Sequence, residues 1–333
     1  MLLCEITINA VVFYVSIDGI QSDGSLLTHN WKPRIIGIDA PQLNIPCTHG
    51  GYAQMAFGSI SFTPELFSGD WPPPVSCPIG LYYTDTTEAV RETIFEGTAH
   101  LSTYNRESIT YSLYGPSYDE TIADATAYNN TLNVILTTIL TSIAEITTVN
   151  TTYARVTSPN VIHTTAGVQL AIDLASNIAA FYSHLIYVIG DTAYLVDMKR
   201  DNGSRTLTEF KFYATPKYIY NPPIALLKCT YDVSEYQAAS SYAYGSTESV
   251  SPYHTTEANI EAALADIVAI ANAPRASFDM PMIAGNFPKL GEKITFPDTS
   301  NVEDLSTYIR ARKLSYDFIN DCITIEGDGV IAA

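Results

Sequence analysis

The stretch VQLAIDLASNIAAFYSHLIYVIGDTAYLVDM, from Val168 to Met198, shows most clearly how this chain folds. In its first half apolar residues recur at three- and four-residue steps, as on one face of a helix. They are Val168, Ala171, Ile172, Ala175, Ile178, Ala179 and Tyr182. From Leu185 the period changes to two, and Gly190-Asp191 supplies a turn that can take positive φ. The pattern predicts a helix packed on a β-hairpin.

Strand-like patterns lie on both sides of this unit. Upstream, the strand candidates are Ile79 to Tyr83, Thr93 to Leu101 and Ser108 to Tyr114, and this density of short strands is typical of a small antiparallel barrel or sandwich. Downstream, the candidates are Thr206 to Val233, Ile294 to Phe296, and Tyr308 to Phe318 pairing with Cys322 to Glu326. We therefore expect two β regions with a different unit between them.

The predicted fold class is α+β and β-rich, with two small antiparallel β-barrel or sandwich domains and helix-and-hairpin insertions. We expect an N-terminal β domain over residues 1–117, a helical and hairpin domain over 118–204, and a C-terminal β domain over 205–333 with a helical insertion near 255–273. Helical spacing predicts a helix within Tyr118 to Val149 and another over Ala258 to Asn272. Asp23-Gly24 is a candidate hairpin tip, and the polar stretch Ser234 to Tyr253 is expected to be a loop or an extended arm.

The composition narrows the possible functions. The chain has 333 residues, 23 tyrosines and a formal net charge of −18. Because DNA and RNA are held by lysine and arginine, this charge argues against a nucleic-acid-binding function. Tyrosine suits both strand cores and protein interfaces. Basic residues are sparse before Asn150 and denser between Lys199 and Lys228, which fits either pairing between copies or ordinary solvated strand faces.

Targeting and redox signals are weak. The five cysteines form no CxxC pair, so we expect buried reduced thiols. The N-terminal run lacks a positive region and contains Glu5, so we expect neither a signal peptide nor a membrane anchor. No uncharged apolar run approaches the length that spans a membrane.

No catalytic or ligand-binding motif stands out. The six histidines are scattered, and no P-loop, GxGxxG or GxSxG motif occurs. The carboxylate pairs Glu92 with Glu96 and Asp317 with Asp321 lie in strand or turn patterns, and Cys47-Thr48-His49 lacks an orienting third group. We predict no catalytic residue, no cofactor and no metal site, and hence no enzyme.

Two segments are candidate strand edges for pairing between subunits, Phe210 to Tyr220 and Tyr308 to Phe318, because both mix apolar and charged residues. The candidate interface residues are Phe210, Phe212, Tyr218, Tyr220, Tyr308, Tyr316 and Phe318.

Three separate pieces of the chain resemble, in the correct order, the bacteriophage tail hub proteins of the trimeric baseplate-hub or tail-tip family. The first is Ile94-Phe95-Glu96-Gly97 with the strands that follow it, and the second is the helix-then-hairpin segment Phe181 to Asp197. The third comprises FPKLGEKITF, from Phe287 to Phe296, and the closing hairpin Leu314 to Gly329. Ser234 to Tyr253 and the first 50 residues have no counterpart.

The resemblance implies a homotrimer in the virion tail, made in the host cytoplasm. Two small β domains per subunit would form a pseudo-sixfold ring that adapts a sixfold tail tube to a threefold tip. Implied partners are the tail tube protein, the tail tip, spike or fibre proteins and the tape-measure protein, with genomic DNA only in transit through the lumen. No cofactor or membrane anchor is implied.

Two other functions stay open from the residues alone. One is a carbohydrate- or receptor-binding adhesin with exposed aromatic platforms, for which the candidates are Trp31, Trp71, Tyr82 and Tyr83. The other is a tail-associated cell-wall hydrolase.

Overall fold

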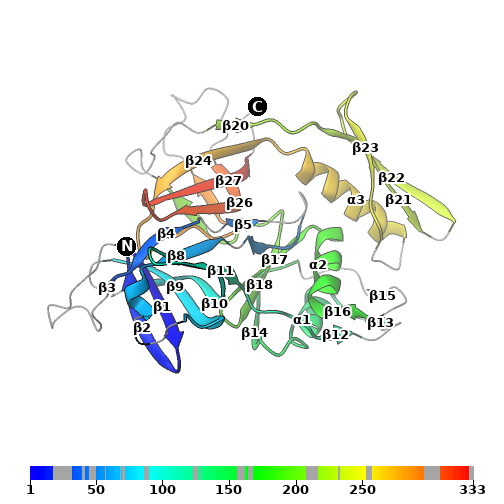
Figure 1. The fold of residues 1–333 in the computed structure, drawn as a ribbon. Helices are drawn as coiled ribbons and strands as arrows, with labels where there is room; N and C mark the ends of the chain where they lie inside the picture. Colours follow the sequence, from blue (N-terminus) through cyan, green and yellow to red (C-terminus); the bar gives the residue numbers. More distant parts are fainter. Residues whose placement is uncertain are drawn as a thin grey trace.

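The computed structural model describes residues 1–17, 32–39, 42–44, 50–56, 58–67, 69, 72–85, 90–122, 127–128, 130–155, 162–163, 168–207, 217–231, 233–252, 257–295 and 308–329. They form four parts, which we call the first β unit, the second β unit, the middle unit and the arm (Figure 1). The fold is α+β and β-rich, as predicted.

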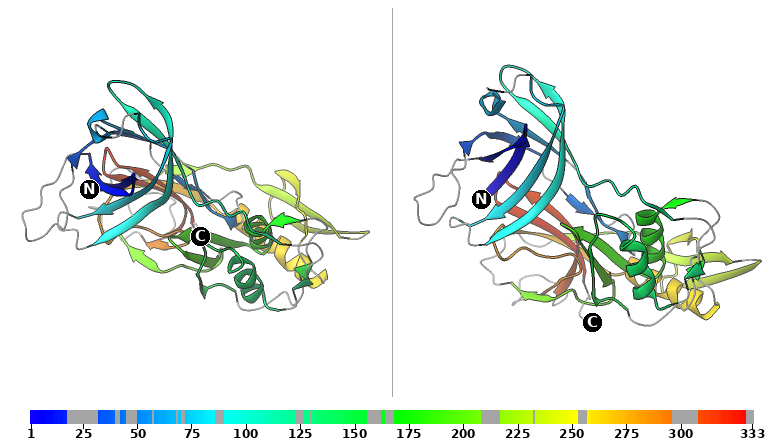
Figure 2. Two further views of the ribbon diagram at one scale, coloured as in Figure 1. Left: turned by 60° about the horizontal axis from the view of Figure 1, so that its bottom comes forward. Right: turned by 90° about the horizontal axis from the view of Figure 1, so that it is seen from below.

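The first β unit is one sheet that curls into a nearly closed barrel (Figure 2). Its strands, in spatial order, are β3 (Lys32–Pro33), β2 (Val11–Ser16), β1 (Leu2–Ile8), β9 (Ser76–Thr84), β10 (Arg91–Tyr104), β11 (Ile109–Tyr114), β8 (Ser59–Phe62) and β4 (Ile35–Ile38). A short 3₁₀ helix, Pro64–Phe67, follows β8. Alternate residues of β1 enter the core, because successive strand side chains point to opposite faces.

The first hairpin has a turn that the sequence pattern did not indicate. β1 and β2 pair with Ile8 opposite Val11, so Asn9 and Ala10 make the turn, with φ of 48° and 66°. Two consecutive positive φ values are typical of a type I′ turn, which matches the twist of the flanking strands. The predicted tip at Asp23-Gly24 lies outside the described residues.

The second β unit contains β19 (Ser204–Thr206), β25 (Lys293–Thr295), β26 (Tyr308–Asp317), β27 (Cys322–Gly329), β24 (Arg275–Pro281) and β20 (Lys217–Ile219), in that spatial order. The predicted hairpin of β26 and β27 is confirmed. Two strands from far upstream join this sheet, since β5 (Gln42–Asn44) pairs with both β26 and β7 (Gln54–Ala56). The division of the chain at residues 117 and 204 stays a prediction.

The two β units repeat one topology. When strands are matched in chain order, β8 corresponds to β24, β9 to β25, β10 to β26 and β11 to β27. The spatial orders are then the same, β9-β10-β11-β8 and β25-β26-β27-β24. Every pairing within the two sets is antiparallel. The chain therefore contains the same four-stranded unit twice.

The middle unit contains the predicted helix and hairpin. Its sheet has the order β14 (Thr148–Tyr153), β18 (Thr192–Asp197), β17 (His184–Ile189) and β6 (Gly51–Tyr52), with α1 (Leu132–Leu140) and α2 (Ala171–Phe181). Short pairs β12 (Thr121–Ile122) with β16 (Gln169–Leu170) and β13 (Ala127–Tyr128) with β15 (Ile162–His163) lie beside it. Gly190 makes the hairpin turn with φ of 59°, as predicted. Val168, expected on the helix face, instead precedes α2 and is 68% exposed.

The hairpin of β17 and β18 is buried on both faces. Leu185 and Tyr187 belong to the core shared by the two β units, whereas Ile186 belongs to a second core beneath the helices. Strand β6 lies parallel to β17, and Gly50 precedes it where an added Cβ would lie 2.4 Å from the backbone oxygen of His184. Glycine is needed there because the two backbones approach so closely.

Helix α1 is shorter than the period of the sequence suggested. Helical spacing ran through Tyr118 to Val149, but the helix spans only Leu132–Leu140. The hydroxyls of Thr137, Thr138 and Thr141 donate to backbone oxygens in the preceding turn, and threonine restricts helical side-chain freedom. Ile143 and Ile146 are still buried, in the turns that follow. The apolar spacing predicted burial correctly and helix length wrongly.

The arm projects away from the β units (Figure 1). Its sheet has the order β22 (Ser234–Ala239), β21 (Ile224–Tyr231) and β23 (Ser246–Ser249), and α3 (Glu257–Ala271) packs on one face of it. Of the two expectations for Ser234 to Tyr253, a loop is wrong for β22 and β23, whereas an extended arm agrees with their position. Among the described residues α3 covers one face of this sheet, and β22 and β23 carry few large apolar residues, so the sequence of these two strands looks like a polar loop.

Buried polar groups connect the middle unit to its neighbours. Arg312, at a bulge in β26, donates to the Asp328 carboxylate at 2.6 Å and to the Met198 backbone oxygen at 2.7 Å. Asn202 donates to the Tyr187 hydroxyl at 2.6 Å and to the Leu290 backbone oxygen at 2.9 Å. Buried charges and amides need such partners, so these contacts fix how the hairpin sits against the second β unit.

His184 is enclosed at the start of β17. Its Nδ1 lies 2.8 Å from the Tyr182 backbone oxygen, and the Arg155 backbone N–H donates to its Nε2 at 3.1 Å. Arg155 also pairs with Asp197 and with Asp266 of α3. A ring nitrogen that accepts a hydrogen bond belongs to the neutral imidazole.

Acidification should destabilise the protein through His184. Burial lowers the pKa of His184 from its ordinary value of 6.5 to about 4, although Asp197 opposes this. The unfolded chain therefore binds a proton that the folded protein excludes. The stabilisation is present above pH 6.5 and is lost as the pH falls toward 4, by about 3 kcal/mol in total.

Urea unfolding at a series of pH values measures this loss. The unfolding free energy of His184→Gln should fall less steeply over this range than that of the unchanged protein. The control His100→Gln removes an exposed histidine and should keep the original slope. Equal slopes for all three proteins would contradict the assignment.

Candidate assembly surfaces

One of the two predicted strand edges lies at the edge of a sheet. Strand β20 (Lys217–Ile219) ends the second β unit and pairs only with β24 among the described strands. Tyr220, directly after it, is 82% exposed. Tyr218 lies within β20, whereas Phe210 and Phe212 lie outside the described residues. A contact between subunits at this edge stays a prediction.

The other predicted edge is wrong. Strand β26, which holds Tyr308 to Asp317, lies inside its sheet, with β27 on one side and β25 and β5 on the other. Tyr316 and Phe318 are 6% and 5% exposed, and their rings stack with centroids 6.2 Å apart. Tyr308 is half-buried, with the Lys293 ammonium over its ring. Alternation of apolar and charged residues marks a strand but does not distinguish an edge from the interior.

A crevice opens where three parts of the chain meet, and we call it the junction crevice. It has a volume of about 800 Å³. Its walls are Thr93–Thr98 of β10 in the first β unit, residues 115–119, and the adjoining ends of α2 and β17 in the middle unit. Leu43 of β5 and Tyr316 of β26 reach it from the second β unit. The packing of the three parts therefore creates this space.

The junction crevice is acidic. Its described lining includes four carboxylates, on Glu96, Asp119, Glu145 and Asp173, and no lysine, arginine or histidine. The Tyr82 hydroxyl donates to Glu96 at 3.0 Å and the Ser117 hydroxyl to Asp119 at 3.1 Å, so both acids are held by neutral donors. The negative potential within the crevice is therefore not neutralised by the residues that line it.

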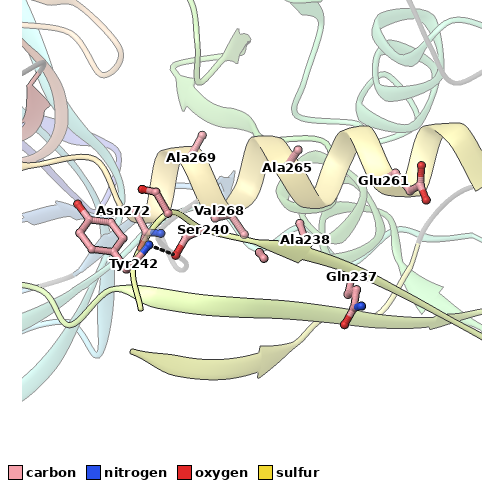
Figure 3. A pocket seen from close by; sticks show the side chains of 11 residues that line it. Gln237, Ala238, Ser240, Tyr242, Glu261, Ala265, Val268, Ala269 and Asn272 are labelled. Carbon is pink, nitrogen blue, oxygen red and sulfur yellow. Dashed lines mark hydrogen bonds between the residues drawn. The ribbon is translucent and has the colours of Figure 1, made fainter. Parts of the chain in front are cut away.

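A second groove lies on the arm, between β22 and the exposed side of α3 (Figure 3). Its volume is about 540 Å³. Small side chains line most of it, including Ala238 on the strand and Ala265 and Ala269 on the helix, as Figure 3 shows. Asn272 closes one end, where it exchanges hydrogen bonds with the Ile224 backbone.

Comparison with solved structures identifies the fold. The prophage MuSo2 43 kDa tail protein from Shewanella oneidensis superposes with a TM-score of 0.57 at 11% identity, over 100% of this chain and 99% of that one. The tail protein from Neisseria meningitidis MC58 gives 0.56 at 8% identity, over 98% and 96%. The chain has a phage tail-protein fold. Prophage tail protein gp18 from Listeria monocytogenes EGD-e agrees, with a TM-score of 0.55 at 11% identity over 98% and 94%.

No family model matches the chain, and no curated protein matches it in sequence. The phage tail-protein fold therefore rests on the arrangement of the elements. It confirms the resemblance noted from the order of three short segments.

Asp317 and Asp321, one of the carboxylate pairs, have structural roles in this fold. The Asp317 carboxylate accepts from the backbone N–H groups of Ile319 and Asn320 in the turn of the last hairpin, and Asp321 accepts from the Tyr83 hydroxyl. Cys47 and His49 lie outside the described residues. No cluster of metal-ligating side chains occurs in the part of the chain that the structure describes.

The described cysteines are free thiols, and most of them are buried. Cys4, Cys77 and Cys229 are free and buried, and Cys322 is free and half-buried. Burial raises the pKa of Cys77 to about 12, so its thiol is a poor nucleophile.

None of the helices among the described residues has the length and apolar character needed to cross a bilayer.

The aromatic residues considered for an adhesin form no platform where the structure describes them. Tyr83 is 5% exposed and donates to the Met282 backbone oxygen at 3.1 Å. The guanidinium of Arg91 lies 3.5 Å above the Tyr82 ring and covers it. Trp31 and Trp71 lie outside the described residues.

The buried and exposed tyrosines should respond differently to substitution. Tyr316→Asp places a charge in the core and should lower the unfolding free energy by about 3 kcal/mol or more. Tyr220→Asp alters an exposed ring and should change it by less than about 0.5 kcal/mol. Urea unfolding measures both. Equal losses would show that Tyr220 is packed or that Tyr316 is not.

Proposed function

We propose that the chain is a structural virion protein, a trimeric tail hub that joins a sixfold tail tube to a threefold tail tip. The observation that carries this proposal is the four-stranded unit present twice in the chain, with one strand order and one set of antiparallel pairings. Three chains related by a threefold axis would place six such units around a ring. That number matches a sixfold tube, whereas one unit per chain would not.

The apolar core that the two β units share would make each chain a rigid segment of the ring. A single apolar cluster includes residues from both β units and from the hairpin between them. The Tyr83 hydroxyl of the first β unit also donates to Asp321 of the second at 3.0 Å. Because close-packed interiors deform little, the two units would keep a fixed angle to each other, as a ring of defined diameter requires.

The proposed ring would form part of the channel for DNA ejection. The chain carries a net charge of −18, so a lumen lined by its acidic side chains would repel DNA phosphates and keep DNA from adhering during passage. The tape-measure protein would be a second molecule within the lumen. The tail tube protein would meet one end of the ring, and the tail tip, spike or fibre proteins would meet the other.

We assign one contact between subunits to the edge of β20 that pairs with no other described strand. An unpaired edge strand can add to the sheet of a neighbouring molecule, and the exposed Tyr220 beside it offers an aromatic anchor. The proposed contact does not include Arg312, Asp328 or the aromatic stack around Tyr316. These residues are buried inside the sheet and stabilise it.

Native mass spectrometry over a concentration series tests the proposal. The mass should be that of three chains, and Tyr220→Asp should weaken trimer formation by about tenfold or more. The control Val233→Asp alters a 99% exposed residue at the tip of the β21–β22 hairpin and should leave the trimer intact. A strict monomer at all concentrations, with and without tail tube protein, would contradict the proposed hub.

A further inference from the structure

The four carboxylates of the junction crevice have no cationic partner among the described residues. None of its four carboxylates, on Glu96, Asp119, Glu145 and Asp173, takes part in the ion pairs among the described residues. Four like charges around one space repel one another, and a cation bound between them would relieve that repulsion.

A second, independent feature points to a ligand in the same space. Tyr316 is 6% exposed and lines the crevice, and its hydroxyl makes no hydrogen bond to a described residue. Its ring is held by stacking on Phe287 and Phe318, with centroid distances of 6.1 and 6.2 Å. With no partner among the described residues, this hydroxyl can accept from an ammonium or guanidinium group in the crevice.

The lining of the crevice also includes exposed apolar side chains. Leu170 and Ile189, which border it, are 37% and 41% exposed. The rings of Tyr52 and Tyr118, also in its lining, meet edge to face with centroids 6.0 Å apart. A small polyamine would neutralise the acids but would leave these side chains in water. A peptide with alternating cationic and apolar side chains would satisfy both.

The chain itself is a poor source of that peptide. Of its 17 lysines and arginines, ten already form ion pairs within the described part of the structure, and the whole chain carries a net charge of −18. A second copy would therefore bring mainly negative charge to a negative crevice. Charge complementarity favours a different protein.

We propose that the junction crevice is a docking site for a lysine- or arginine-bearing extended segment of another protein. Apolar side chains of that segment cover Leu170 and Ile189, and its cations lie among the four carboxylates and the Tyr316 hydroxyl. Because the middle unit and both β units contribute to the crevice, the bound segment bridges all three. This site does not depend on the proposed trimer.

Fluorescence anisotropy with a labelled peptide of alternating lysine and leucine tests the proposal on the full chain. The double variant Glu145→Gln/Asp173→Asn should weaken binding by about tenfold, and Tyr316→Phe, which removes only a hydroxyl, by about threefold. The matched control Glu107→Gln/Glu248→Gln removes the same charge from exposed sites elsewhere and should change binding less than about twofold.

Three results would overturn the proposal. Equal weakening by the two double variants would show that the peptide adheres to acidic surface in general. Unchanged binding when the leucines of the peptide are replaced by glutamine, with full displacement by spermidine, would indicate a small-cation site. If the peptide does not bind and Glu145→Gln/Asp173→Asn changes the native mass, the occupant is a second copy.

Discussion

The structure depends on one hairpin that is buried on both faces. Leu185 and Tyr187 of β17 enter the core of the two β units, and Ile186 between them enters the core beneath the helices. A shift of one residue in its register would exchange these faces and disrupt both cores. Asn202, Arg312 and the Gly50 backbone fix the register from outside the hairpin, through polar contacts and close approach. The hairpin therefore sets how the other parts meet.

The sequence predicted the parts of the fold that depend on local pattern. The period change at Leu185 and the Gly190-Asp191 turn gave the central hairpin, and the closing hairpin of β26 and β27 followed from strand spacing. Prediction failed where distant segments decide the outcome. Nothing local in Gln42–Asn44 indicates that β5 pairs with β26, and that pairing helps to place β26 inside its sheet. The polar sequence of β22 concealed a strand whose inner face is covered by α3.

The junction crevice shows the same limit at the level of a site. Its acids come from β10, from residues 115–119, from the turn after α1 and from the start of α2, so no contiguous motif marks it. Assembly around the central hairpin brings them together. The repeated four-stranded unit was also visible only in the strand order, because its two copies differ in strand length and in the elements inserted between them. Both features follow from tertiary packing, which local sequence patterns do not record.

The central claim is that two equivalent β units per chain supply six positions around a ring. Electron microscopy of the purified protein bound to tail tube protein tests this most directly. The account predicts a threefold-symmetric ring in which six β units surround an open or plugged lumen, with alternate units belonging to the same repeat. A single chain bound to the outside of the tube, or a ring whose β units are not six in number, would contradict it.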